Sequence, residues 1–237
     1  MTRLSVNINK IALIRNSRGS NYPDLIEMAK DCERFGAQGI TVHPRPDERH
    51  VKFSDLQPLI DIVATEFNIE GYPDDHFIQE MIKVRPHQCT LVPDQPGQLT
   101  SDHGWDTIKN FELLSERISE LKKNNIRVSL FIDPVEKLIE GAAKTGADRI
   151  EFYTGPYAKE FPKNREKAIE KIKQTSPLAT QLSLGINAGH DLNLHNLKYF
   201  KQQIPQLAEV SIGHAIICDA IYYGLENTIR LYLHELK

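Results

Sequence analysis

The sequence predicts an α/β fold built on a parallel sheet, and three observations lead to it. The 237 residues are 40% hydrophobic and 26% charged, which is typical of a globular protein. Eight short runs rich in β-branched residues recur along the chain, and a segment with helical hydrophobic spacing follows each of them. Their starts lie about 29 residues apart, which suits a strand, a helix and two loops. Eight such units predict a (β/α)8 TIM barrel with extra helices, formed by residues 1–237 as a single domain.

The expected strands are the eight β-branched runs. They start at Leu4, Gly39, Phe67, Gln88, Arg127, Arg149, Leu182 and Ala208. Regular alternation of strands and helices implies parallel pairing with right-handed crossovers. An open doubly wound sheet is the alternative, and it is disfavoured because no glycine-rich phosphate fingerprint follows the first run.

The expected helices show apolar residues on one face. They include residues 23–35, 110–124 and a final helix over 216–236. Two connections, 94–124 and 157–181, are longer than one helix and its loops require. We therefore expect an extra helix in each of them.

Composition excludes several classes of protein. The formal net charge of −3 argues against a general nucleic-acid binder, and no apolar run is long enough to span a membrane. Cys32, Cys89 and Cys218 lie far apart, which argues against a disulfide framework or a zinc site. The first residues lack the apolar core of a secretion signal, so we expect a cytoplasmic protein.

Polar and charged residues gather where the expected strands end. In a barrel of this class the strand ends meet at one face, which is where ligands bind. Barrel interiors usually hold Val, Ile and Leu, so packing does not require these residues. A lone polar residue at a strand end is more often a helix cap, but a set from seven strands predicts an active site. The set is Asn7, Asn9, Lys10, His43, Arg45, Glu70, Asp133, Glu151, Asn187, His190, Gly213 and His214.

Three segments are candidates for binding phosphate. Arg45 and His50 could clamp a phosphate, because guanidinium groups suit bidentate contacts. The basic turn 15–19 could hold a second anion, and the helix that begins after Gly213 could bind one at its amino end. The alternatives are a solvated loop in which Asp47 and Glu48 pair with Arg49, and an ordinary basic turn. A metal site at His43 and His50 would lack a third ligand.

The two carboxyl groups in apolar strands are candidates for proton transfer. Glu70 and Glu151 are flanked by apolar residues, so burial should raise the pKa of each toward the range of a general base. The alternative is a carboxylate paired with Arg45 or Lys10. His190 and His214 could equally be structural histidines, and Tyr153 is expected to pack.

The chain resembles the pyridoxine 5′-phosphate synthase family. The segments that carry this resemblance are VNINKIALIRNSRG, GITVHPRPDERH, FNIEG, LVPD followed by Thr100, VSLFIDP, IEFYTGPYA, INAGHDLNLHN and VSIGHAII. The resemblance implies a barrel with three extra helices used in assembly, usually into a homo-octamer built as a tetramer of dimers. It also implies condensation of 1-deoxy-D-xylulose 5-phosphate with 3-amino-2-oxopropyl phosphate. The products are pyridoxine 5′-phosphate, phosphate and water, and neither a metal nor an organic cofactor takes part.

The resemblance also implies roles for individual residues. His43 and Glu70 would accept protons, His190 would donate one and Glu151 would stabilise the transition state. The remaining matches are substrate contacts. Arg45, His50 and Thr100 would bind the deoxyxylulose phosphate, and Asn7, Arg18, Gly213 and His214 the amino-oxopropyl phosphate.

The chain departs from the family pattern at three expected substrate contacts. Asn9-Lys10 stands where the family often has Asp-His, and Asp191 stands where it often has Gly. An amide cannot ionise, so Asn9 could offer hydrogen bonds but no proton transfer. The contact at Asp191 would then be made through its backbone.

Two other functions remain open at this point. One is a different phosphosugar enzyme, an aldolase with Lys10 as a Schiff-base lysine or an epimerase. The other is a phosphate-ligand binder without catalytic activity.

Overall fold

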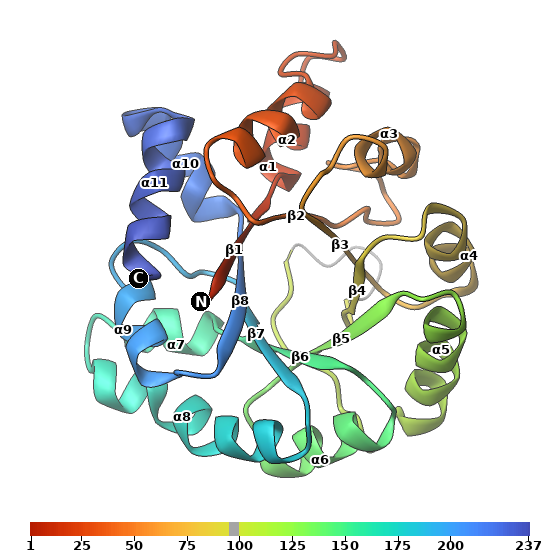
Figure 1. The fold of residues 1–237 in the computed structure, drawn as a ribbon, viewed down its shortest axis with the longest axis vertical. Coiled ribbons are helices and arrows are strands. Elements are labelled where there is room, and N and C mark those ends of the chain that lie inside the picture. Colours follow the sequence, from red (N-terminus) through yellow and green to blue (C-terminus); the bar gives the residue numbers. More distant parts are fainter. Residues whose placement is uncertain (95–99) are drawn as a thin grey trace.

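The strands form a closed parallel barrel. A computed structural model describes residues 1–94 and 100–237, and in it each strand pairs with the next and β1 pairs with β8 (Figure 1). This confirms the predicted fold. The strands are β1 (Arg3–Asn7), β2 (Gly39–Val42), β3 (Glu66–Gly71), β4 (Gln88–Leu91), β5 (Arg127–Ile132), β6 (Arg149–Tyr153), β7 (Gly185–Gly189) and β8 (Leu207–Ile212).

Strand β7 begins three residues later than we predicted. The preceding helix continues to Gln181, and residues 182–184 form a turn in which Ser183 has φ 62°. The β-branched pattern alone does not distinguish this turn from the strand that follows it.

Helices surround the barrel (Figure 1). In the described residues they are α1 (Asn9–Asn16), α2 (Leu25–Arg34), η1 (Phe53–Asp55), α3 (Leu56–Ile60), α4 (Asp75–Val84), α5 (Phe111–Lys123), α6 (Glu136–Lys144), α7 (Gly155–Glu160), α8 (Arg165–Gln181), α9 (Leu197–Gln203), α10 (His214–Tyr223) and α11 (Leu225–Glu235). Asp24 caps α2, because its Oδ1 accepts hydrogen bonds from the backbone N–H groups of Ile26 and Glu27.

The expected extra helices are found in one of the two long connections. Residues 157–181 hold most of α7 together with α8, as predicted. The described part of 94–124 holds α5 and no further helix, so that prediction is wrong there. The prediction of a single final helix is also wrong. The segment forms two helices, α10 and α11, which are separated at Gly224, a residue with φ 75°.

Side chains alternate along the strands between the helices and the barrel interior. The side that faces the helices is apolar, whereas the interior is polar where barrels usually hold aliphatic residues. Asn68 shows this most clearly: its amide donates to Thr41, and its carbonyl oxygen accepts from Gln88 (3.2 Å) and Thr90 (3.0 Å). Ser5 and Thr41 are linked by a 2.7 Å hydrogen bond. The polar side chains of Ser5, Thr41, Asn68, Gln88 and Thr90 are thus satisfied by one another across neighbouring strands.

An ionic network closes the interior at the amino ends of the strands. Glu66 of β3 pairs with Arg3 at 2.9 Å, with Arg127, and with Arg149 at 3.8 Å. Glu209 of β8 lies beside two of these arginines, Arg3 and Arg149, and its burial raises its pKa to about 7. Because these partners come from β1, β3, β5, β6 and β8, the network ties opposite sides of the barrel together.

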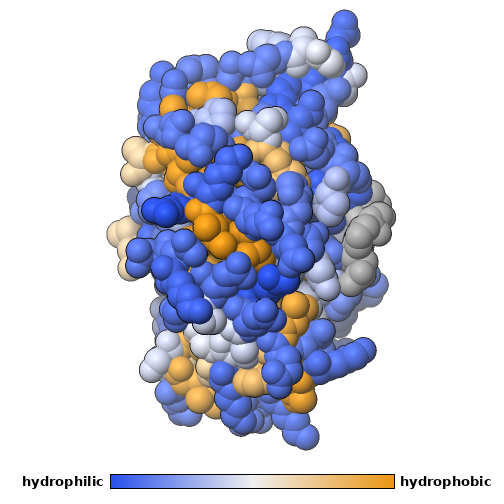
Figure 2. Space-filling view, turned by 90° about the vertical axis from the view of Figure 1, so that its right-hand side faces the viewer, coloured by the Kyte–Doolittle hydropathy of each residue, from blue (hydrophilic) through white to orange (hydrophobic). Residues whose placement is uncertain are grey.

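On one side of the molecule the outer surface is mostly polar (Figure 2). Figure 2 shows the side that carries α3, α4 and α5, where hydrophobic residues gather in separate patches among hydrophilic ones. Among the described residues, no helix is both long enough and apolar enough to cross a membrane.

The apolar side of the strands gives a stability prediction. Phe152 of β6 is fully buried, so Phe152→Ala should lower the free energy of unfolding by about 3–5 kcal/mol. Ile108→Ala is the control, because Ile108 is 59% exposed and should change that energy by less than about 0.5 kcal/mol. Urea denaturation followed by circular dichroism measures both. Equal midpoints for the two variants would contradict the assignment of Phe152 to the core.

Candidate active site

A cavity of about 1200 Å³ opens at the carboxyl ends of the strands. Every residue that we predicted to be catalytic or to bind substrate lines it, except Arg18. Two further strand-end residues lie elsewhere: Asp133 accepts a hydrogen bond from Gly104 N, and Asn187 accepts one from Arg149 inside the barrel. The lining residues are Asn7, Asn9, Lys10, His43, Arg45, His50, Glu70, Thr100, Glu151, His190, Asp191, Gly213 and His214.

Arg18 lies outside this lining, on the exposed turn that follows α1. The helix starts at Asn9, which lines the cavity, and its eight residues span roughly 12 Å at about 1.5 Å per residue. Arg15, in the same basic segment, is held by Asp55, whose two carboxylate oxygens each accept a 2.8 Å hydrogen bond.

Glu70 is the buried carboxyl group at the end of β3. Its Oε2 lies 3.8 Å from Nδ1 of His43, and its Oε1 lies 3.5 Å from the hydroxyl of Ser211 on β8. Burial raises the pKa of Glu70 to about 8, and the nearby charge of Asp94 adds to this effect while Arg45 opposes it. Roughly a tenth of the group is therefore ionised at pH 7. The raised pKa that the sequence predicted is confirmed.

Glu151 of β6 is a second buried carboxyl group. It is 3% exposed, and its Oε2 has no hydrogen-bond partner among the described residues. Burial, reinforced by Glu70 and Glu209, raises the pKa of Glu151 well above its usual value. Burial thus favours the neutral acid, and in that form the group can donate a hydrogen bond into the cavity.

Both histidines on the β2 side are neutral at neutral pH. Burial, together with the charge of Arg45, lowers the pKa of His43 well below its ordinary value. The same causes lower the pKa of His50 to about 4. His43 is therefore available to accept a proton, and His50 can contact a phosphate as a neutral hydrogen-bond donor rather than as a cation.

The loop after β2 is held by a few specific contacts. Nη2 of Arg45 lies 2.7 Å from Oδ2 of Asp94, which follows β4. On the other side of the loop, Asn16 donates to the backbone oxygen of His50 at 2.7 Å. Arg49 pairs with Asp47 as the alternative interpretation predicted, whereas Glu48 accepts a hydrogen bond from Phe53 N.

His190 follows β7 and is contacted at both ring nitrogens. Nε2 lies 2.9 Å from the hydroxyl of Thr100, and Nδ1 lies 3.0 Å from a carboxylate oxygen of Asp191. The hydrogen bond with His190 lowers the pKa of Asp191. Both residues have positive φ, 79° and 60°, so the backbone bends sharply at this point. The side chain of Asp191 therefore contacts the imidazole, which the sequence did not predict.

Asn9 connects the first two strand ends. Its Oδ1 accepts a 2.9 Å hydrogen bond from His43 N, and its own N–H donates to Asn7. An amide fills this positioning role without ionising. Opposite these residues, a Cβ at Gly213 would come within 3.0 Å of Asn7, so glycine allows the start of α10 to approach β1.

Several lining residues were missed by sequence reasoning. Tyr153 was expected to pack, yet it lines the cavity and its ring meets that of His190 edge-on at 5.1 Å. The alternation of β6 could have found it, because Glu151 and Tyr153 are two residues apart. The other polar ones lie on β8, in α7 or in loops, where no strand pattern points to them. They are Ser101, Asp102, Lys159, Asn193 and Ser211.

The cavity is equipped for proton transfer and anion binding. It combines neutral carboxyl groups, a neutral imidazole and basic residues on two sides. A search of residues 1–94 and 100–237 finds no group of three or more His, Cys, Asp or Glu side chains that could hold a metal ion. Groups of this kind can pass protons stepwise to and from a substrate held by its phosphates.

Solved structures of other barrels share this fold. The chain matches phosphoribosylanthranilate isomerase from Thermotoga maritima with a TM-score of 0.63 and 11% identity, covering 100% of this chain and 98% of the other. It matches tryptophan synthase from M. tuberculosis with a TM-score of 0.65 and 9% identity, covering 100% and 94%. Identities this low support the fold alone.

Sequence relatives are much more similar. The pyridoxine 5′-phosphate synthase of Cytophaga hutchinsonii is 62% identical over 237 residues, which is 100% of both chains. That of Parabacteroides distasonis is 57% identical over 232 residues, 98% of each. The family described as pyridoxal phosphate biosynthesis protein PdxJ matches residues 4–237. The chain therefore belongs to the PdxJ family.

Proposed function

We propose that this cavity carries out the pyridoxine 5′-phosphate synthase reaction, joining 1-deoxy-D-xylulose 5-phosphate and 3-amino-2-oxopropyl phosphate. The observation that carries the proposal is the pair of Glu70 and His43, 3.8 Å apart, next to the phosphate-binding candidates Arg45 and His50. Two proton acceptors beside an anion site suit a condensation in which almost every step moves a proton.

The proposed roles follow from the protonation states. His43 is neutral and Glu70 is partly ionised at neutral pH, so both can remove protons during enolisation and water loss. Glu151 is neutral and can donate a hydrogen bond to an oxygen on which negative charge develops. His190, held by Thr100 and Asp191, is the proposed proton donor.

Two anion sites would align the substrates. We place the deoxyxylulose phosphate at Arg45, His50 and Thr100. The amino-oxopropyl phosphate would lie at Asn7, Gly213 and His214, with Lys10 beside it. Anchoring both phosphates holds the amine of one substrate against the carbonyl of the other, which raises their effective concentration. Proton transfers and Schiff-base chemistry suffice for this reaction, so we propose that it needs no metal or organic cofactor.

Replacing Glu70 separates binding from catalysis. Glu70→Gln should lower kcat by about 100-fold or more, because the amide keeps the shape but cannot accept a proton. Isothermal titration calorimetry should show substrate affinity unchanged within about threefold, because the phosphate sites are intact. Gln57→Glu on α3 is the control. It exchanges the same two residue types at an exposed position that does not line the cavity. Unchanged turnover in Glu70→Gln would remove Glu70 from the mechanism.

The raised pKa of Glu70 gives a pH prediction. As a proton acceptor, Glu70 must be ionised in the free enzyme, so kcat/KM should rise by about tenfold per pH unit. The rise should level off near pH 8, where Glu70 titrates. Steady-state kinetics from pH 6 to 9.5 measure this limb. A profile that falls across this range would mean that Glu70 acts as an acid instead.

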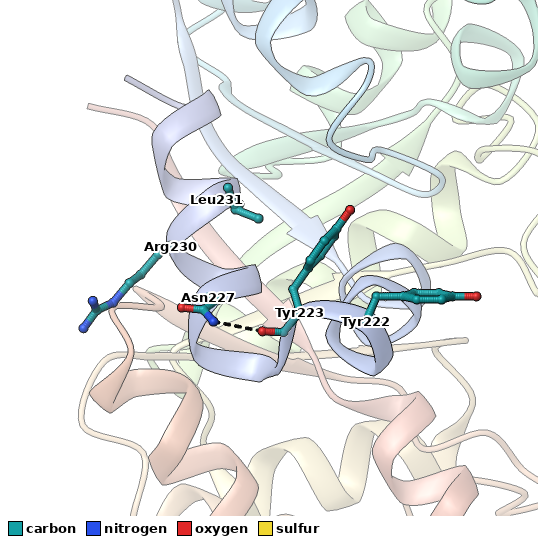
Figure 3. Close-up of a pocket in the computed structure, with 5 residues that line it drawn as sticks. All are labelled: Tyr222, Tyr223, Asn227, Arg230 and Leu231. Carbon is teal, nitrogen blue, oxygen red and sulfur yellow. Dashed lines mark hydrogen bonds between the residues drawn. The ribbon is translucent and has the colours of Figure 1, made fainter.

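We also propose that the chain self-associates, into the homo-octamer that the family resemblance implies. Exposed apolar side chains form a helix patch, which consists of Leu13, Ile14, Ile221, Tyr222, Tyr223 and Leu231 on α1, α10 and α11. Tyr222 is 84% exposed and Ile221 is 76% exposed. Figure 3 shows Tyr222 and Tyr223 projecting from the end of α10, beside a hollow of about 580 Å³. Apolar residues this exposed are typical of a surface that another copy covers.

The helix patch can be tested by a double substitution. Ile221→Ser with Tyr222→Ser should reduce the molar mass measured by light scattering to a smaller assembly, because the buried apolar area is lost. Ile108→Ser, which changes an exposed apolar residue outside the patch, should leave the mass unchanged. A wild-type protein that is monomeric would overturn the assembly proposal.

Two further proposals concern the chain as a whole. We take residues 1–237 as a single domain, because β1 and β8, from opposite ends of the chain, pair with each other. We place the protein in the cytoplasm, because all three cysteines are free thiols, which suits a reducing compartment.

A further inference from the structure

Asp94, which sequence reasoning did not assign to the site, lies three residues after β4 with a buried carboxylate. Its side chain is 3% exposed. Oδ2 accepts two hydrogen bonds, from Nη2 of Arg45 at 2.7 Å and from the hydroxyl of Ser101 at 2.8 Å. Oδ1 is buried and has no hydrogen-bond partner among the described residues. A carboxylate this deeply buried is retained only where a partner compensates its charge.

The contact joins two loops of the cavity. Arg45 follows β2 and is itself 7% exposed, whereas Asp94 follows β4. The strand between them is β3, whose last but one residue is Glu70. The ion pair therefore spans the strand that carries the proposed proton acceptor, and both of its charges act on that carboxyl group.

We propose that Asp94 is a positioning residue of this site, whose buried carboxylate holds the guanidinium of Arg45 and so keeps Arg45 from pairing with Glu70. This inference rests on the proposed function, which makes Glu70 a proton acceptor. An unrestrained Arg45 would be drawn to Glu70, the other carboxyl group within its electrostatic reach. Glu70 would then be an ion-paired carboxylate and a weaker base.

The charges around Glu70 support this role. Asp94 raises the pKa of Glu70 and Arg45 lowers it, after burial as the main cause. The titratable or polar groups that face Glu70 come from the neighbouring strand ends and from across the barrel. They are His43 and Arg45 after β2, Asp94 after β4, Glu151 on β6 and Ser211 on β8, with the Cys89 thiol on the adjoining strand β4. Arg45 is the cation of this set, so its charge opposes the effects of burial and of Asp94 on the pKa of Glu70.

The test is the titration of Glu70 itself, measured by NMR on protein with ¹³C-labelled glutamate carboxyl groups. The Glu70 resonance is assigned by its loss in Glu70→Gln. In Asp94→Asn the midpoint should fall by about one pH unit, because a repulsive charge is lost and Arg45 is released. In Arg45→Gln the midpoint should rise, because the attractive charge is lost while Asp94 remains. A contact that only holds the loops together, without acting on the charge of Glu70, would leave the midpoint unchanged in both variants.

Three controls complete the design. Ser101→Ala removes the other partner of Oδ2 without changing charge, so the midpoint should stay within about 0.3 pH unit. Asp94→Glu keeps the charge and should also leave it near the wild-type value. Asp61→Asn removes an exposed carboxylate on the outside of the barrel and should have no effect. Circular dichroism confirms folding, and Arg45→Gln alone decides the question if Asp94→Asn does not fold.

Kinetics provide a second measurement. In Asp94→Asn the rising limb of kcat/KM should move to lower pH together with the NMR midpoint. A midpoint unchanged in both Asp94→Asn and Arg45→Gln would overturn the role of Asp94, whatever the activity. A wild-type protein that makes no product would overturn the proposed function, and the NMR titration would still decide whether Asp94 and Arg45 control Glu70.

Discussion

The carboxyl groups of Glu70 and Glu151 point into the interior of a closed barrel, and the properties of the site depend on this burial. Charged forms are costly where solvent is excluded, so burial raises the pKa of both groups, that of Glu70 to about 8. The same burial keeps His43 and His50 neutral. Neutral acids and bases can exchange protons with a substrate at little electrostatic cost. Burial therefore sets the protonation states that a multistep condensation requires.

Side chains alternate along the strands, so one set of residues stabilises the barrel and the other forms the site. Outward residues such as Phe152 pack against the helices, while inward ones such as Glu151 and Asn68 build a polar interior. At the amino ends the inward residues form an ionic network around Glu66, and at the carboxyl ends they form the cavity. Where the strands end, short contacts such as that of Asn9 with His43 N fix the loops.

The sequence predicted the barrel and most of the cavity, because both follow from local patterns. Strand ends are recognisable, and parallel strands must bring them together, so residues as distant as Asn7 and His214 could be placed at one site. What could not be predicted depends on the path of the chain between strands. Arg18 follows Asn9 closely in sequence, but it lies on the exposed turn after α1 and not in the cavity lining. The pairing of Arg45 with Asp94 joins loops 49 residues apart, and no local pattern reports it. The break at Gly224 was hidden because apolar residues continue through it.

The central claim is that this cavity joins two phosphorylated substrates through Schiff-base chemistry and proton transfers, without a metal ion. The most direct measurement mixes 1-deoxy-D-xylulose 5-phosphate and 3-amino-2-oxopropyl phosphate with the folded protein in the presence of a metal chelator. Chromatography then follows pyridoxine 5′-phosphate, and a colorimetric assay follows free phosphate. The account predicts that both appear together, in equal amounts, and that neither appears with Glu70→Gln over the same period. Folded wild-type protein that releases no pyridoxine 5′-phosphate under these conditions would contradict it.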